Sequence, residues 1–460
     1  MSYFDFNAIN KNAHIHFIGI GGISMSGLAR ILLNNGYEIS GSDRSGSHIT
    51  DSLESMGIKV YIGNKEENIE GADLFVYTAA MSEDNPEMKA ARESGKPMIT
   101  RAECLGSVMK KYRANVCVAG THGKTTTTSI LSHAFIGCGM DPTISIGGEL
   151  DLIGGNIRVG GNDLFLTEAC EYTNSFLEFF PSVAVITNIE ADHLDFFKDI
   201  DEIIESFGKF AALTGDNGCV VAYGEDENIK KALDLKNLRV ITYGLSDKCD
   251  YYADNIKFSE GLPSFDIIGS GEKICSVSLN VPGTHNILNT LASVAVCRHL
   301  GADTEKAVRG IEGFRGTHRR FEKKGEFNGA VIIDDYAHHP TEIAATLKAA
   351  DRFDKNKLWC VFQPHTYSRT RLLWDDFVKC FDNVDELIIT HIYAAREEFD
   401  GVTRADKLAE EIKKRGVKAR YIESFDDIAQ VLREELSAGD MLFTMGAGDV
   451  VEIGNKLISA

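Results

Sequence analysis

The segment with the clearest chemistry is Gly120-Thr-His-Gly-Lys-Thr-Thr126, which follows an apolar run and opens a helix-forming stretch. Glycines let the backbone curl so that several N–H groups converge on an anion, and a helix N-terminus adds partial positive charge. In such a loop Lys124 is expected to contact the β- and γ-phosphates, and the Thr125 hydroxyl to reach Mg²⁺. Val118 replaces the first glycine of the usual pattern, so this loop is a shortened variant. We predict an ATP site formed by Gly120, Thr121, His122, Gly123, Lys124, Thr125 and Thr126.

A second glycine-rich segment, Gly19-Ile-Gly-Gly-Ile-Ser-Met-Ser-Gly27, lies between the first apolar run and the first predicted helix. It approximates G-x-G-x-x-G, with Ser24 at the third glycine position. Asp43 ends the next apolar run, about 20 residues on, where a carboxylate can reach a ribose. The pattern is compatible with NAD, with a nucleotide-sugar, or with a tight turn that binds nothing. The candidate ligand contacts are Gly19, Gly21, Gly22, Met25, Ser26 and Asp43.

Two further side chains, Glu168 and His193, follow apolar runs in the middle of the chain. In an open parallel sheet the carboxyl ends of the strands share a crevice with the phosphate-binding loop. A carboxylate there is a plausible Mg²⁺ ligand, whereas an imidazole suits softer metals better. His193 can therefore be either a ligand or a histidine that only hydrogen-bonds at a strand end. With Thr125, these residues are the candidate metal ligands.

Histidines and arginines gather at predicted strand ends in the last third of the chain. They occur in Asp334-Asp-Tyr-Ala-His-His-Pro340 and in Gln363-Pro-His-Thr-Tyr-Ser-Arg369-Thr-Arg371. Arg319 and Arg320 precede them, where a guanidinium can reach a transferring phosphoryl group. Because adjacent side chains on an extended segment point in opposite directions, we expect only one of these two arginines to do so. Together these groups indicate an anionic ligand.

The elements that position these residues alternate between short apolar runs and helix-period segments, which is typical of parallel α/β sheets. We therefore predict an α/β fold of three domains: residues 1–110, 111–315 and 316–460. Helices are expected at residues 25–33 and 126–135. Strands are expected near Ile144 and at residues 14–20, 37–40, 59–62, 74–78, 116–119, 164–167, 183–187, 220–223, 331–333, 358–362, 387–391, 419–422 and 441–444.

Composition narrows the class of protein. The 460 residues carry 48 basic and 68 acidic side chains, a net charge of −20, which argues against nucleic acid as the main partner. The ten cysteines are scattered without a Cys-x-x-Cys pair, as in reduced intracellular proteins. The N-terminus lacks the features of a secretion signal, and no apolar run reaches the roughly 18 residues of a membrane span. We expect a cytoplasmic protein without membrane insertion.

In order and spacing, the motifs of this sequence closely resemble those of the Mur ligases of bacterial peptidoglycan synthesis. The resemblance extends from about residue 14 to residue 448. Besides the segments quoted above, it rests on Glu168-Ala-Cys-Glu171, Asn188-Ile-Glu-Ala-Asp-His193, Pro282-Gly-Thr-His-Asn286 and Arg319-Arg-Phe321. The sequence departs from common family patterns at Ser24, at Gly63-Asn64 and at the Cys-Glu-Tyr segment after Ala169.

The resemblance implies a Rossmann-like N-terminal domain for a UDP-sugar, a central ATPase domain of P-loop type and a Rossmann-like C-terminal domain for an amino acid. It assigns the first glycine-rich segment to the UDP-sugar, and Glu168 and His193 to metal. Asn286 would contact adenine, Asp335 the nucleotide and Arg320 the γ-phosphate. Tyr336, His338, His365 and Arg369 would surround the amino acid. Some relatives use a carbamylated lysine at the metal, and Lys209 lies nearby in the sequence.

The implied reaction is ATP- and Mg²⁺-dependent ligation of L-alanine to UDP-N-acetylmuramate through an acyl-phosphate, with Lys124, Arg320 and His338 as catalytic residues. The segment at residues 363–369 favours this alanine-adding branch. The runner-up is another amide ligase of the family, such as the one that recycles murein tripeptide. Two other classes of protein are the alternatives. A nicotinamide dehydrogenase would have no use for the ATP loop, and a P-loop switch protein would make no amide. We expect a monomer or a weak homodimer.

Overall fold

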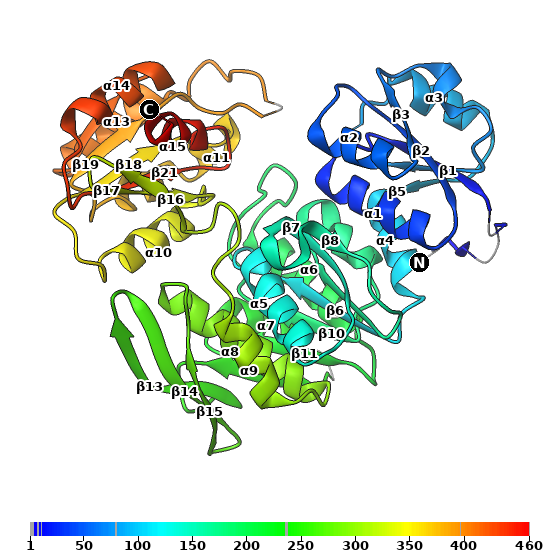
Figure 1. Ribbon diagram of the computed structural model, residues 1–460, viewed down its shortest axis with the longest axis horizontal. Helices are drawn as coiled ribbons and strands as arrows, with labels where there is room; N and C mark the ends of the chain where they lie inside the picture. Colours follow the sequence, from blue (N-terminus) through cyan, green and yellow to red (C-terminus); the bar gives the residue numbers. More distant parts are fainter. Residues whose placement is uncertain are drawn as a thin grey trace. The chain divides into compact units, whose positions relative to one another are not determined.

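The computed structural model describes residues 4–6, 9–10, 12–78, 81–234, 238–395 and 397–459 (Figure 1). The chain forms two compact units. The first consists of Met1–Glu190, Ile200–Tyr243 and Ala292–Gly310, and the second of Ala191–Asp199, Gly244–Leu291 and Ile311–Ala460. Among the described residues, no helix is both long enough and apolar enough to cross a membrane.

The first unit begins with a five-stranded parallel sheet in the order β3-β2-β1-β4-β5. Its central strand is buried because Ile15, Phe17 and Ile18 are fully covered. This order places the turn between β1 and α1 at the carboxyl edge of the sheet. The elements are β1 (His14–Ile18), α1 (Ile23–Asn34), β2 (Glu38–Asp43), α2 (His48–Ser55), β3 (Lys59–Ile62), β4 (Leu74–Tyr77), α3 (Pro86–Glu93), β5 (Met98–Thr100) and α4 (Arg101–Met109).

A second sheet of the same unit carries the predicted ATP loop between β6 and α5. Within this unit its strands follow the order β12-β11-β10-β6-β9-β7-β8, and neighbouring strands of this series are parallel except for β7 and β8. The carboxyl ends of β6, β9 and β10 therefore lie at one edge. The elements are β6 (Ala114–Ala119), α5 (Lys124–Gly137), β7 (Thr143–Leu150), β8 (Gly155–Arg158), β9 (Leu164–Glu168), β10 (Val183–Ile186), α6 (Ile200–Ala212), β11 (Cys219–Tyr223), α7 (Glu227–Leu233) and β12 (Val240–Gly244).

The second unit contains a six-stranded sheet in the order β16-β17-β21-β18-β19-β20, parallel except for β16. Alternate strand residues face opposite sides, so Ile333 and Cys360 enter one core while Ile332 and Trp359 enter the other. The strands are β16 (Glu322–Phe327), β17 (Ala330–Asp335), β18 (Leu358–Phe362), β19 (Glu386–Ile389), β20 (Lys418–Tyr421) and β21 (Met441–Met445). The first core packs under α10 (Pro340–Ala350), α12 (Trp374–Lys379) and α13 (Ala405–Lys414), and the second under α14 (Phe425–Glu435) and α15 (Val451–Ile458).

An antiparallel meander in the second unit was not predicted from the sequence. It consists of β13 (Tyr251–Ser259), β14 (Leu262–Gly269) and β15 (Glu272–Ser278). Two helices follow in the chain, α8 (Thr284–His299) and α9 (Thr304–Glu312). The predicted strands and the two predicted helices are confirmed, with ends displaced by a few residues. The boundaries predicted for the three domains remain predictions.

Candidate active site

The loop from β6 to α5 depends on two glycines with positive φ. Gly120 has φ +141°, and a Cβ there would lie 1.9 Å from the Thr187 hydroxyl oxygen. Gly123 has φ +81° and directly precedes α5. Only glycine adopts such conformations without strain. The curled loop opens a 14-residue helix, which is the local structure that favours an anion.

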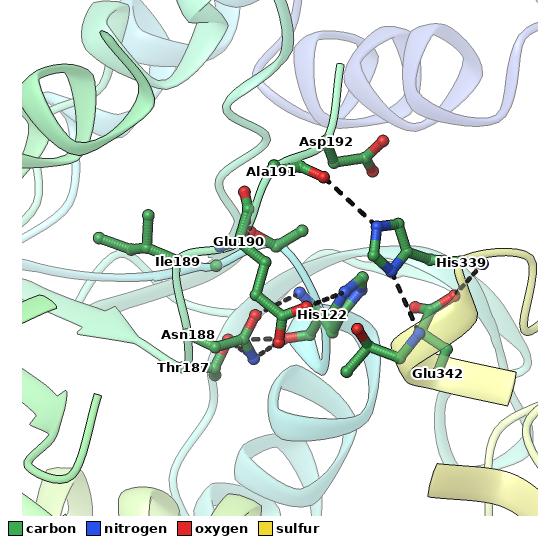
Figure 2. Close-up of polar contacts among 12 residues, drawn as sticks. His122, Thr187, Asn188, Ile189, Glu190, Ala191, Asp192, His339 and Glu342 are labelled. Atoms are coloured by element: carbon green, nitrogen blue, oxygen red, sulfur yellow. Dashed lines mark hydrogen bonds and ion pairs between the residues drawn. The ribbon is translucent and has the colours of Figure 1, made fainter. Parts of the chain in front are cut away.

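The loop is held from outside by residues that follow β10 (Figure 2). Asn188 accepts a hydrogen bond from the His122 backbone N–H at 2.9 Å and donates to the His122 carbonyl at 3.0 Å. Thr187 donates to the same carbonyl at 2.6 Å. The Glu190 carboxylate lies 3.5 Å from Nε2 of His122. The predicted ATP loop therefore has a fixed backbone at its tip.

Lys124, at the start of α5, is largely covered and lies beside a carboxylate that was not predicted as a site residue. Its Nζ donates to Glu171 at 3.1 and 3.2 Å, and to the carbonyls of Gly120 and Thr121. Burial by itself would lower the pKa of the Lys124 ammonium, but the charge of Glu171 outweighs it and raises the pKa above its usual value. Lys124 is therefore a permanent cation at the end of the loop.

Thr125 and Glu168, two of the predicted metal ligands, are brought together. The Thr125 hydroxyl donates to Glu168 Oε2 at 3.1 Å, and Glu168 Oε1 accepts from the Gly147 backbone N–H at 2.6 Å. A hydroxyl and a carboxylate at the mouth of a phosphate-binding loop are hard oxygen donors, so these residues fit Mg²⁺. Lys209, in contrast, is 57% exposed and pairs with Glu205 on α6, which is not the setting of a buried metal ligand.

In the N-terminal sheet, the residues predicted to bind a UDP-sugar form a turn that is stabilised by hydrogen bonds among themselves and their neighbours. Asp43 accepts a hydrogen bond from the Gly21 backbone N–H at 2.8 Å. The Ser26 hydroxyl donates to the Ile23 carbonyl at 2.9 Å, and Met25 is only 3% exposed. Gly19 has φ +88°, so it also needs to be glycine. The structure thus explains how Asp43 closes the turn, and the contacts to a UDP-sugar remain predictions.

Arg319 and Arg320 correct one expectation. Arg319 has φ +61° and lies in a turn rather than on an extended segment. Both guanidinium groups therefore lie over the Tyr336 ring, at 4.9 and 5.1 Å from its centroid. The prediction that the two side chains point apart is wrong.

The two arginines differ in their carboxylate partners. Arg319 pairs with the fully buried Asp334 at 3.0 Å, whereas Arg320 lies 3.8 Å from Glu342. Arg320 has the looser pairing.

Asp335 and Asn286 are both buried and bonded within the second unit. Asp335 accepts from the backbone N–H groups of Phe321 and Ala337 and from the Thr346 hydroxyl. Burial raises the pKa of Asp335 to about 6. Asn286 donates to the Pro282 carbonyl at 2.7 Å. Their predicted contacts to the nucleotide remain predictions.

The residues predicted to hold the amino acid form one cluster. The rings of Tyr336 and His338 are 5.5 Å apart, and those of His338 and His365 are 5.7 Å apart. Arg369, on α11 (Tyr367–Leu372), donates from Nη1 to Nδ1 of His365 at 3.1 Å. Burial lowers the pKa of His338 to about 3 and that of His365 to about 4. Both rings are therefore neutral at pH 7.

The hydrogen bonds fix the tautomers of both rings. Nδ1 of His338 lies 3.0 Å from the Tyr336 carbonyl, which can only accept, so Nδ1 carries the proton and Nε2 has a lone pair. Nδ1 of His365 accepts from an arginine, so its proton is on Nε2. His338 therefore presents an acceptor, and His365 a donor.

The segment after β10 contributes Asp192, a residue that was not predicted. Asp192 Oδ1 accepts from Arg369 Nε at 3.3 Å and Nη2 at 3.1 Å. Its neighbour His193 has φ +53° and donates its backbone N–H to the same oxygen at 2.8 Å. His339 Nε2 contacts the Ala191 carbonyl at 3.3 Å (Figure 2). His193 belongs to the second unit, so its role as a metal ligand remains a prediction.

Comparison with known proteins gives matches along nearly the whole chain. Residues 14–113 match the description "Mur ligase family, catalytic domain", residues 118–297 "Mur ligase middle domain", and residues 319–448 "Mur ligase, glutamate ligase domain". A UDP-N-acetylmuramate–L-alanine ligase of Clostridium botulinum strain Langeland is 53% identical over 451 residues, which are 98% of each chain. The ligase of the same name from Acetivibrio thermocellus is 51% identical, covering 98% of this chain and 96% of its own.

Solved structures agree with these matches. The UDP-N-acetylmuramate–alanine ligase of Thermotoga maritima superposes with a TM-score of 0.82 at 29% identity, covering 97% of this chain and 98% of its own. A murein peptide ligase of Psychrobacter arcticus gives a TM-score of 0.72 at 23% identity, which speaks for the fold alone. The three-domain architecture with mixed α/β sheets is therefore shared.

Proposed function

Since the chain belongs to the Mur ligase family, we propose that it joins L-alanine to the carboxylate of UDP-N-acetylmuramate with consumption of ATP. The observation that carries this proposal is the 53% identity, over 98% of both chains, to a ligase named for that reaction. The reaction is the first peptide-stem step of peptidoglycan precursor synthesis. It requires activation, because a carboxylate does not condense unaided with an ammonium group in water.

In the first step, the muramyl carboxylate attacks the γ-phosphate of ATP, the bond to the β,γ-bridging oxygen breaks, and an acyl-phosphate and ADP form. Such a transfer needs positioning and dispersal of charge more than covalent help from the protein. The N–H groups of the loop at residues 120–126 and the Lys124 ammonium are the groups suited to this work. Arg320 is the candidate second cation because its carboxylate partner is the more distant one.

Thr125 and Glu168 would hold Mg²⁺ at the phosphates, with His193 as a further candidate. When bound, Mg²⁺ supplies a positive charge that polarises the transferring phosphoryl group. Glu171 has a separate task in this scheme. Its carboxylate keeps Lys124 protonated at the end of the loop.

In the second step, the amine of L-alanine attacks the acyl carbon and phosphate leaves. The Nε2 lone pair of His338 can accept a hydrogen bond from this amine. With a pKa of about 3, His338 is too weak a base to keep the proton, because a general base works best near the ambient pH. His338 therefore orients the amine, and the released proton passes to solvent. Arg369 binds the alanine carboxylate.

The test is phosphate release from ATP with Mg²⁺ and UDP-N-acetylmuramate, with and without L-alanine, followed by the mass of the product. Alanine-dependent phosphate together with the matching amide supports the proposal, and Lys124→Ala should abolish both. Phosphate that depends instead on the tripeptide L-alanyl-γ-D-glutamyl-meso-diaminopimelate would make the chain a murein peptide ligase. Lys209→Ala, an exposed change, is the matched control.

The same proposal extends to the setting of the enzyme. Its substrates are small and water-soluble, and we propose that it acts in the cytoplasm as a monomer or a weak homodimer. Sedimentation of the purified chain at several concentrations tests the oligomeric state. A stable higher oligomer would contradict it.

A further inference from the structure

The Arg369 guanidinium is held on two sides by residues from different parts of the chain. Asp192 accepts from Nε and Nη2, and Nδ1 of His365 accepts from Nη1. The ion pair is largely covered, with side-chain exposures of 12% for Arg369 and 11% for Asp192. Its geometry is therefore persistent, unlike that of an exposed pair.

These contacts leave a defined set of donors. A guanidinium has five N–H donors in one plane. Asp192 uses one on Nε and one on Nη2, and His365 uses one on Nη1. Within the described part of the chain, one N–H on each terminal nitrogen is then left. Because both terminal nitrogens keep a donor, the guanidinium can offer one N–H to each oxygen of a carboxylate.

Asp192 is itself fixed, which is what a positioning group requires. Its Oδ1 also accepts the His193 backbone N–H at 2.8 Å. The Arg369 backbone is fixed as well, because the Thr366 hydroxyl accepts from its N–H at the start of α11. The guanidinium therefore cannot turn freely to meet a ligand.

We propose that Asp192 is a positioning residue that sets the orientation of Arg369 for a free α-carboxylate, and so makes the enzyme select an amino acid over its carboxyl-blocked derivatives. This inference rests on the proposed function. It assigns Asp192 to Arg369 rather than to the ammonium of alanine. The reason is that its Oδ1 accepts from three donors, while its Oδ2 lies 3.7 Å from Nε2 of His193.

A carboxylate facing the amine would also be counterproductive. It would stabilise the ammonium form, whereas the reaction needs the free amine. The neutral Nε2 of His338 is the better neighbour for that group. Asp192 therefore acts on the carboxylate end of the substrate, through Arg369.

The experiment compares L-alanine with L-alaninamide, which has the same amine but no carboxylate. In Asp192→Asn we expect the KM for alanine to rise about 10- to 150-fold, the range of a lost hydrogen bond to a charged group. The KM for alaninamide, and those for ATP and UDP-N-acetylmuramate, should stay within about twofold. The preference for alanine over alaninamide therefore shrinks, which a general loss of structure does not produce.

Two further variants complete the design. Asp400→Asn changes the carboxylate that pairs with Arg371, a 55% exposed arginine on the same helix as Arg369, and it should leave every KM unchanged. Arg369→Lys keeps a cation beside Asp192 but has no planar fork, so it should lose the preference for alanine even if Asp192→Asn folds poorly. Half-saturation by Mg²⁺ should be unchanged in Asp192→Asn, which separates its role from that of neighbouring His193.

Two results overturn the inference. An unchanged KM for alanine in Asp192→Asn means that Arg369 needs no orientation. A lower KM means that Asp192 competes with the substrate for Arg369. If the wild-type chain makes no amide with alanine, the proposed function fails first and this inference fails with it.

Discussion

Gly120→Ala is the change whose effect on the ATP loop can be worked out most directly. The added Cβ would lie 1.9 Å from Oγ1 of Thr187. Ordinary contact begins at 3.4 Å, so one of the two must move by 3.4 − 1.9 = 1.5 Å. Thr187 is only 6% exposed and donates to the His122 carbonyl, so the loop is the part that yields.

Two costs add for this variant. Overpacking of this kind costs about 1–3 kcal/mol, and a non-glycine residue in such a backbone conformation costs about 1–3 kcal/mol. The displacement also moves the N–H groups of the loop away from the phosphates. Losing one hydrogen bond to a charged group, about 1.5–3 kcal/mol, weakens ATP binding about 10- to 150-fold.

The assay is the Kd for ATP, measured by calorimetry on the intact chain. Gly139→Ala is the control, because Gly139 follows α5, has φ +76° and has nothing within 4 Å of an added Cβ. That change should leave the Kd unaltered. The double variant Gly120→Ala/Thr187→Ala removes the clash but keeps the backbone strain. Its Kd for ATP should therefore lie between those of the wild type and Gly120→Ala. An unaltered Kd in Gly120→Ala would refute the reasoning, because the loop backbone would then not be the phosphate contact.

Three further outcomes are expected. Burial lowers the pKa of His16 to about 3. The free energy of unfolding therefore falls as the pH drops below 6.5, by up to about 1.4 kcal/mol per pH unit. In His16→Gln the unfolding midpoint should depend less on pH between pH 6.5 and 4. Glu168→Gln should raise the Mg²⁺ concentration for half-maximal activity at least about tenfold, while Lys209→Ala should not. A Cβ on Gly27 would lie 2.2 Å from Ile157, so Gly27→Ala should lower the melting temperature. Adding Ile157→Ala to that variant should restore it.

The parallel strands were predictable because strands covered on both faces form continuous apolar runs. The segment Leu358–Phe362, which is buried at every position, was predicted with the bounds that the structure has. The meander of β13 to β15 was missed for the opposite reason. In Leu262–Gly269 buried and half-buried residues alternate along much of the strand, and no continuous apolar run marks it.

The parts of the site that are backbone motifs could be recognised in the sequence. The contacts that depend on the tertiary fold could not. The ATP loop is such a motif, since Gly120 and Gly123 have positive φ and the glycine pattern is visible in the sequence. Asp192 and Arg369 are 177 residues apart, and no spacing rule joins them. Arg319 was misjudged because its positive φ gives no sign in the sequence around it.

The three partly buried cations that the sequence identified share a feature that it did not reveal. Lys124 pairs with Glu171, Arg369 with Asp192 and Arg319 with Asp334, and in each pair the carboxylate is no more than 11% exposed. A cation taken out of water without a counter-charge costs several kcal/mol, so the fold must supply the carboxylate itself. What each cation can bind then depends on which of its N–H groups are not used by that carboxylate. Arg319 gives Nε to Asp334 and Nη2 to the Gly446 carbonyl, so Arg320 is the arginine of that pair that we propose as the contact of the phosphoryl group.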